Sequence, residues 1–314
     1  MNYQLTTFVN ILILLSMAIG APALVISLLA IFNIKIKKEW KVYLYAFTAG
    51  LLIILGTVGF INEAIMHSKE NFVNDLAGEH THEALSVINT LQIIGVVAGG
   101  AIIGTTITIL SRYIFTKIVH KKTNAGLEKG LCIHESHMSH NHNDFIFNES
   151  DIDNRKQKWL PVLLLCAHRL IDGIALGFMA NTGTNTIAGF ENWGMIIIFI
   201  VHLIPTTLVI YLIQLDVQNN RRWKALFISI LLLFIMIPFT ILGGFLINNI
   251  QSIWWLMPLF YSISGTLMTL GGILEVIPEF IHMRNAKISE WIWIVVWLSS
   301  AIILSIVLLL IHSH

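Results

Sequence analysis

Eight long apolar runs constrain the fold of this chain more than any other feature of its sequence. They cover residues 8–32, 43–65, 88–111, 159–180, 194–215, 225–247, 256–281 and 291–311. Each is close to the roughly 20 residues that a helix needs to cross the hydrocarbon core of a bilayer. Only helices and closed barrels satisfy their backbone polar groups in lipid, and barrel strands alternate over about ten residues. We therefore predict an all-α polytopic membrane protein, a single domain of eight transmembrane helices over residues 1–314.

The composition agrees with a membrane protein and excludes several other classes. Only 12% of the 314 residues are charged, about half of the roughly 25% usual in soluble domains. No basic face suggests a nucleic-acid partner, and the two cysteines, Cys132 in a polar loop and Cys166 inside a run, do not form a disulfide framework. The N-terminus has no basic residue before its apolar run, so we expect that run to be a retained helix and not a cleaved signal peptide.

The basic residues predict how the helices are oriented. Of the 19 lysines and arginines, 17 lie in the loops that follow the first, third, fifth and seventh runs. The opposite loops hold only Lys69, and Arg169 lies inside the fourth run. By the positive-inside rule, both termini are extracytoplasmic and the loop 112–158 is cytoplasmic. This loop is polar enough to be disordered, and the richness in Ile, Asn and Lys is typical of an AT-rich bacterial genome. We therefore expect the plasma membrane, the inner membrane of a bacterium.

The fourth run carries three ionisable residues near its centre, in the sequence Cys166-Ala-His168-Arg169-Leu-Ile-Asp172-Gly173. Each charge at the middle of a membrane helix costs roughly 2.5–3.5 kcal/mol on insertion scales. Such groups are found in membrane helices where they face a bundle interior, pair with one another or bind an ion. His168 and Asp172 are four residues apart and share a helical face. An imidazole and a carboxylate on one face are two ligands for a divalent transition metal.

The fifth run places a second histidine, His202, at the same predicted depth. Pro205 has no N–H to donate to the carbonyl of Val201, so that carbonyl needs another partner, which can be a hydroxyl, water or a cation. A lone buried histidine is often purely structural. The sequence leaves the structural and the metal-ligand interpretations of His202 equally open.

Acidic residues mark the two ends of a predicted path through the bundle. Glu275 and Glu279 share a face in the inner third of the seventh run, and His282 follows one turn later. One of these acids can pair with Arg169, the only basic residue at membrane depth. Glu63, at the outer end of the second run, is either an interfacial anchor or a gate.

The polar loops also carry residues that bind metals. The cytoplasmic loop contains a short His/Cys tract, a pattern that often binds metal loosely but also fits an idle linker: Cys132, His134, His137, His140 and His142. The outer loop is either merely solvated or a weak cation-gathering vestibule, with Glu70, Asp75, Glu79, His80, His82 and Glu83. Two glycine pairs, Gly100 with Gly104 and Gly173 with Gly177, have the spacing of close helix contacts.

Together these motifs resemble those of the ZIP (Zrt/Irt-like) family of divalent metal transporters. Residues 168–173, His-Arg-Leu-Ile-Asp-Gly, are similar to the family pattern His-Asn-x-x-Asp-Gly of helix 4. Residues 202–207, His-Leu-Ile-Pro-Thr-Thr, stand where the family has His-Glu-x-Pro-His-Glu or His-Asn-x-Pro-Glu-Gly. Residues 275–279, Glu-Val-Ile-Pro-Glu, match the helix 7 pattern. Residues 59–63, Gly-Phe-Ile-Asn-Glu, stand where the family's helix 2 ends His-x-x-Pro-Glu.

The resemblance implies a transporter and not an enzyme. It implies uptake into the cytoplasm of a divalent metal, zinc first and iron, manganese or cadmium as alternatives, through a midplane site on the fourth and fifth helices. The metal is the substrate, and no organic cofactor is expected. The expected partners are metal ions and the lipid bilayer, with a monomer and a homodimer both left open.

The chain departs from the family pattern at the positions that would hold a second metal. Arg169 replaces an asparagine, and Leu203 and Thr206 or Thr207 replace the acids of helix 5. A fixed cation beside a metal repels it by several kcal/mol at an effective dielectric constant near 20. We therefore predict that the second metal is absent and that Arg169 supplies a positive charge in its place.

The predicted site holds one metal at His168, Asp172 and His202, with water or Thr206 completing the coordination. The predicted metal pathway comprises Glu63, Thr206, Glu275, Glu279 and His282. Two other functions remain open. The chain can be a degenerate ZIP-like protein that moves another solute or regulates a partner. It can also be an intramembrane zinc hydrolase that activates water at the same three residues, although this chemistry requires a further acid or base.

Overall fold

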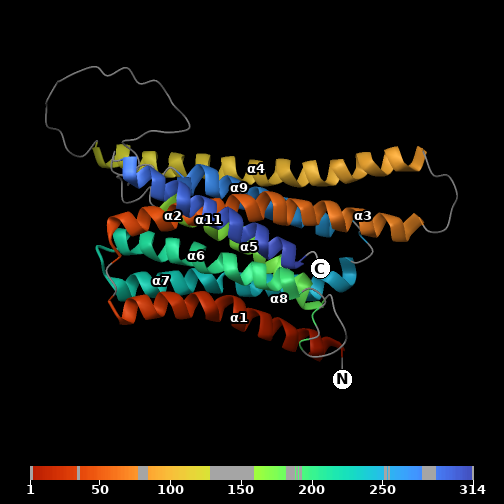
Figure 1. Cartoon of the computed structure of the whole chain (residues 1–314), viewed down its shortest axis with the longest axis horizontal. Helices are drawn as coiled ribbons and strands as arrows, with labels where there is room; N and C mark the ends of the chain where they lie inside the picture. The colour runs from red at the N-terminus through yellow and green to blue at the C-terminus, as the bar shows by residue number, and fades with distance from the viewer. Residues whose placement is uncertain are drawn as a thin grey trace, which may run out of the picture.

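The computed structural model describes residues 3–33, 36–76, 84–127, 159–181, 188, 190, 193–250, 253, 255–277 and 288–312. Nearly all of these residues are helical, and the helices run side by side along the length of the molecule (Figure 1). Seven helical stretches within these ranges are long and apolar enough to cross a membrane. The predicted class, an all-α multi-pass membrane protein, is confirmed to that extent.

The helices follow the apolar runs of the sequence. In chain order they are α1 (Tyr3–Ile31), α2 (Lys38–Ile54), η1 (Leu55–Ile61), α3 (Asn62–Leu76), α4 (Ala84–Leu127), α5 (Trp159–Asn181), α6 (Trp193–Val217), α7 (Arg222–Phe234), α8 (Met236–Ile250), α9 (Leu256–Gly271), η3 (Gly272–Val276) and α11 (Ile288–His312). The stretches η1 and η3 are π-helical. Such short stretches occur inside α-helices and are frequent at functional sites.

The helix ends differ from the predicted bounds in several places, and the second predicted helix, 43–65, extends from Lys38 to Leu76 through α2, η1 and α3. Residues 112–127 belong to α4 and not to the predicted cytoplasmic loop, because adding lysine and arginine residues to an existing helix requires only propagation, not nucleation. The predicted helix 225–247 is interrupted at Ile235, between α7 and α8. Pro238 explains the interruption, because its ring clashes with the carbonyl four residues earlier, that of Phe234.

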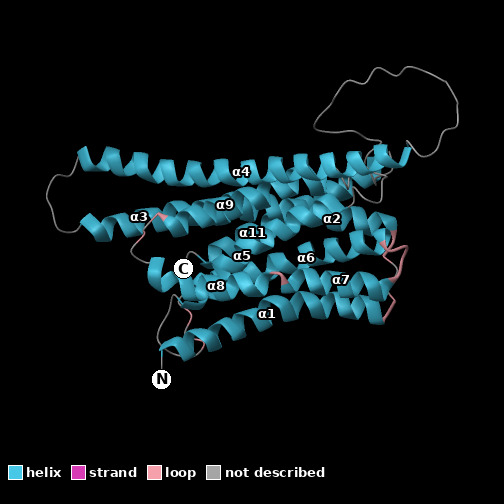
Figure 2. Cartoon of the chain, turned by 180° about the vertical axis from the view of Figure 1, so that it is seen from behind, coloured by secondary structure: helices cyan, strands magenta, loops and turns pink. Residues whose placement is uncertain are grey.

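The helices pack as two groups, which are named here by their members. The first helix group comprises α1, α5, α6, α7 and α8, and the second comprises α2, α3, α4, α9 and α11. Figures 1 and 2 show α4 along one edge of the molecule and α1 along the opposite edge. The groups meet mainly where α5 packs on α9 and where α6 packs on α2 and α11. The residues of α5 and α6 therefore lie at the boundary between the two groups.

One ion pair joins the two groups near the predicted cytoplasmic end. The Nζ atom of Lys41 on α2 lies 2.8 Å from Oδ1 of Asp216 on α6. Both side chains are partly exposed, and exposed ion pairs contribute only about 0–1 kcal/mol. This contact therefore aligns the helix ends more than it stabilises the fold.

The glycine pairs lie at close helix contacts, as their spacing predicts. A Cβ atom on Gly104 of α4 would lie 3.0 Å from the carbonyl oxygen of Ile263 on α9. A Cβ atom on Gly177 of α5 would overlap backbone atoms of Thr240 and Gly244 on α8. In each pair, the absence of a side chain lets the two backbones approach. This packing fixes the rotation of α5 about its axis, and with it the direction in which its polar residues point.

Candidate metal centre

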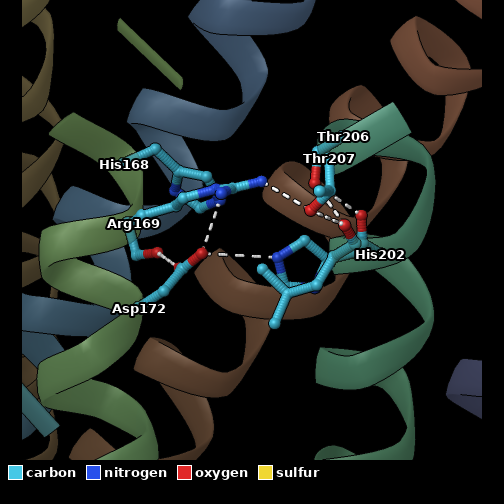
Figure 3. A network of polar contacts seen from close by, with 8 residues as sticks. His168, Arg169, Asp172, His202, Thr206 and Thr207 are labelled. Atoms are coloured by element: carbon cyan, nitrogen blue, oxygen red, sulfur yellow. Dashed lines mark hydrogen bonds and ion pairs between the residues drawn. The ribbon is translucent and has the colours of Figure 1, made fainter. Parts of the chain in front are cut away.

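Three buried side chains from α5 and α6 converge at one point inside the bundle (Figure 3). His168 and Asp172 lie one turn apart on α5, and His202 lies on α6. The exposed fractions are 3% for His168 and 0% for the other two. The sequence prediction that these three residues meet is therefore matched by the structure. Among the described residues, no other group of three or more histidine, cysteine, aspartate or glutamate side chains converges in this way.

The three ligand atoms lie close to one another. Nε2 of His168 lies 2.9 Å from Oδ2 of Asp172, and Nε2 of His202 lies 3.3 Å from the same oxygen. All three ligand atoms lie within 4.8 Å of one another. Ligands at about 2.0–2.2 Å from a tetrahedral zinc lie roughly 3.3–3.6 Å apart. The two pairs that include Oδ2 are therefore close to the spacing of zinc ligands.

The His168 ring is incompletely satisfied by the described residues. Its Nε2 is close to Asp172, but the two atoms are not aligned as a hydrogen bond, and its Nδ1 has no partner within the described ranges. A buried polar atom without a partner costs about 1–3 kcal/mol. A cation bound by Nε2 would offset part of this cost, so the ring is able to serve as a metal ligand.

Ser264 on α9 supports the site from the second helix group, and the sequence analysis did not identify it. Its hydroxyl donates a hydrogen bond to Oδ1 of Asp172 over 3.0 Å, while Oδ2 faces the histidines. The ring of Phe199 contacts the edge of His202, with 5.0 Å between the centroids. The one sequence signal for Ser264 is its place in the stretch Ser262-Ile-Ser-Gly-Thr266, which puts three hydroxyl residues into a largely apolar helix.

A substitution of Ser264 tests its supporting role. We expect Ser264→Ala to weaken zinc binding by roughly tenfold, because partners that orient metal ligands contribute about 10–100-fold to affinity. Ser262→Ala is the matched control, since the Ser262 hydroxyl bonds the carbonyl of Val97 on α4 and not the site. Equilibrium zinc binding to the purified variants measures the effect. Equal affinities of the two variants would remove Ser264 from the site.

Arg169 lies beside the three ligands, and its guanidinium bonds to α6. Its side chain is 1% exposed, and Nη2 donates a hydrogen bond to Oγ1 of Thr207 over 2.6 Å. The Thr207 hydroxyl in turn donates to the carbonyl of Leu203. Figure 3 shows the guanidinium reaching from α5 toward Thr206 and Thr207 on α6. Nη1 has no hydrogen-bond partner among the described residues.

Thr206 is also buried at the site, but its hydroxyl is already engaged. It donates to the carbonyls of His202 and Leu203, at 2.9 and 3.1 Å. Its oxygen keeps lone pairs for a further interaction. Whether Thr206 or water completes the coordination stays a prediction.

The predicted pathway residues are placed only in part. Glu63 lies in α3 and is largely buried, with Oε1 3.3 Å from Nε2 of His67. The His67 ring stacks on Tyr261 of α9, with 5.5 Å between the centroids. Glu275 lies in η3, and its side chain is outside the described part of the structure, so its pairing with Arg169 stays a prediction. The remaining predicted residues lie outside the described residues: Glu279, His282, Cys132, His134, His137, His140 and His142.

The acidic outer segment is partly helical. Glu70 and Asp75 belong to the end of α3, while Glu79, His80, His82 and Glu83 lie outside the described residues. The proposed vestibule therefore stays a prediction.

Comparisons with known proteins assign no relative. No protein-family model matches the chain, and no curated protein matches its sequence. Function is therefore inferred from the buried site and the helix bundle that surrounds it.

Proposed function

We propose that this chain is a membrane transporter that carries a divalent transition-metal cation, zinc first, into the cytoplasm. The observation that supports this proposal is the convergence of His168, Asp172 and His202 on a point closed off from solvent. Two imidazole nitrogens and one carboxylate oxygen suit zinc, and also iron and manganese. Cadmium is the remaining alternative. Three protein ligands leave one coordination position for an exchangeable ligand, as a site that must release its ion requires.

We also propose eight spans, with α5 as the eighth beside the seven that meet the length and hydropathy criteria. α5 has 23 residues, enough to cross the bilayer, and its two charged residues, Arg169 and Asp172, face the protein interior. With α2–η1–α3, α7–α8 and α9–η3 each counted as one span, both termini are extracytoplasmic. The basic residues then gather on the cytoplasmic side, which fits insertion in a plasma membrane.

The place of the site within the bundle favours transport over a purely structural metal. The three ligands belong to the first helix group, and Ser264, which holds Asp172, belongs to the second. Transporters hold their substrate near the midplane between two parts that move against each other. We propose that α5 and α6 move with the first helix group and expose the site to each side in turn.

Radiometal uptake tests this proposal directly. The purified full-length chain is reconstituted into liposomes, and uptake of labelled zinc is compared with that of iron, manganese and cadmium. We expect saturable uptake, fastest for zinc, that empty liposomes lack. The absence of metal flux would contradict the transporter, and lipid or peptide cleavage by the same preparation would favour the hydrolase.

A further inference from the structure

The guanidinium of Arg169 offers a hydrogen-bond donor that the described part of the protein does not use. Nη2 is held by Thr207, whose own proton goes to the carbonyl of Leu203. This anchor fixes the orientation of the planar group, and Nη1 is left buried and without a partner in the described ranges. A buried arginine whose fork is half satisfied is a ready donor to an anion, because guanidinium bonds well to anionic acceptors.

The charges around the site lead to the same conclusion. Among the described residues that contact one another at the site, Asp172 is the only acid, and Arg169 contributes one positive charge beside it. These two charges cancel before any metal arrives. Within this described set, a divalent cation bound by Asp172 and the two histidines would therefore leave two positive charges without compensation in a dry interior. Unpaired buried charge is strongly unfavourable.

We propose that the metal binds together with a small monovalent anion, held between the metal and Nη1 of Arg169. This inference rests on the proposed function and names its substrate as a metal–anion pair. The anion would take the coordination position that the three protein ligands leave vacant. It has two sources: chloride from the solution, or hydroxide from a water molecule whose proton stays in the solution on the side of entry.

Measuring the charge that accompanies each zinc ion tests the proposal. Proteoliposomes that contain the full-length chain are supplied with labelled zinc in chloride or in methanesulfonate, a larger and weakly coordinating anion. The concentration of unbound zinc is buffered to the same value in both, and current and uptake are recorded together. We expect about one elementary charge per zinc ion, because the anion offsets one of the two charges of zinc.

The two media separate the sources of the anion. About one charge per zinc in chloride but about two in methanesulfonate assigns chloride, and we then expect uptake to fall roughly tenfold in methanesulfonate, as loss of one charge-assisted hydrogen bond implies. About one charge in both media assigns hydroxide. About two charges in both media overturns the proposal.

Arg169→Gln and Thr207→Val identify the donor. Arg169→Gln keeps N–H groups but removes the charge, and we expect it to transport zinc with about two charges per ion in both media. Thr207→Val removes the hydroxyl that accepts the hydrogen bond from Nη2. We expect this variant to show a smaller difference between chloride and methanesulfonate than the unmodified chain, but not to lose it. An Arg169→Gln variant with the charge count and anion response of the unmodified chain would overturn the proposal.

A binding measurement keeps the inference testable if the protein does not transport zinc. Zinc binding to the detergent-purified chain is measured by calorimetry in both media, together with the protons released. Binding that is about tenfold tighter in chloride, or that releases about one proton only when Arg169 is present, supports the metal–anion pair even without flux. Binding without either response, or no zinc binding at all, overturns it.

Discussion

Asp172→Asn is expected to weaken zinc binding by roughly a hundredfold or more and to abolish measurable uptake. Asparagine has the same shape and can still accept the hydrogen bond from Ser264, so the substitution removes mainly the negative charge. Both histidine Nε2 atoms approach the oxygen that loses it. A hundredfold change corresponds to about 2.8 kcal/mol, a modest value for the only carboxylate among three ligands. Zinc binding by calorimetry and uptake into liposomes measure the effect.

Two controls separate loss of a ligand from loss of the fold. Asp216→Asn neutralises a partly exposed acid that pairs with Lys41 on α2, and it should bind zinc normally. Asp172→Asn also removes the acid that the described residues place near the buried Arg169, and a buried charge without compensation lowers stability. Adding Arg169→Gln to Asp172→Asn should recover stability without recovering zinc binding. A folded Asp172→Asn variant with unchanged zinc affinity would show that the metal lies elsewhere.

Gly177→Ala is expected to lower the thermal unfolding temperature by roughly 5 °C or more. Its new methyl group would overlap backbone atoms of Thr240 and Gly244 on α8, and backbone atoms cannot rotate away as a flexible side chain can. Forcing extra volume into a packed contact costs about 1–3 kcal/mol, occasionally more, and each kcal/mol moves the midpoint of a large domain by about 2–4 °C. The unfolding temperature of the detergent-solubilised protein is measured by heating samples and quantifying the remaining folded protein by size-exclusion chromatography.

Gly99→Ala on α4 is the matched control for this packing prediction. A Cβ atom at Gly99 meets nothing within 4 Å, and alanine favours the helix over glycine by about 1 kcal/mol. We therefore expect an unchanged or slightly raised unfolding temperature. A Gly177→Ala variant as stable as Gly99→Ala would mean that α5 and α8 are not in backbone contact.

The sequence predicts the helices and the three ligands because both depend on local spacing. The apolar runs determine where helices form, and His168 and Asp172 share a face because they are four residues apart. The equal depth of His202 follows from its place midway along its own run. These features require no knowledge of which helices are neighbours.

The features that the sequence does not predict depend on tertiary contacts. Ser264 reaches Asp172 only because α9 packs on α5. Thr207 accepts the hydrogen bond from Arg169 only because α6 places its hydroxyl beside α5. The π-helical stretch η1 packs against α9, where Gly56 approaches the carbonyl of Gly265. No periodicity in the sequence encodes these neighbours.

The hydrogen bond between Ser264 and Asp172 has a consequence for the proposed transporter. It joins the two helix groups at the carboxylate that the metal would bind. Coupling between two interactions is reciprocal, so a metal that Ser264 helps to bind would in turn strengthen the hydrogen bond between Oδ1 and the serine hydroxyl. In the proposed transporter the metal-bound form would then be held more firmly at the boundary between the two helix groups than the empty form, and loss of the ion would favour their separation.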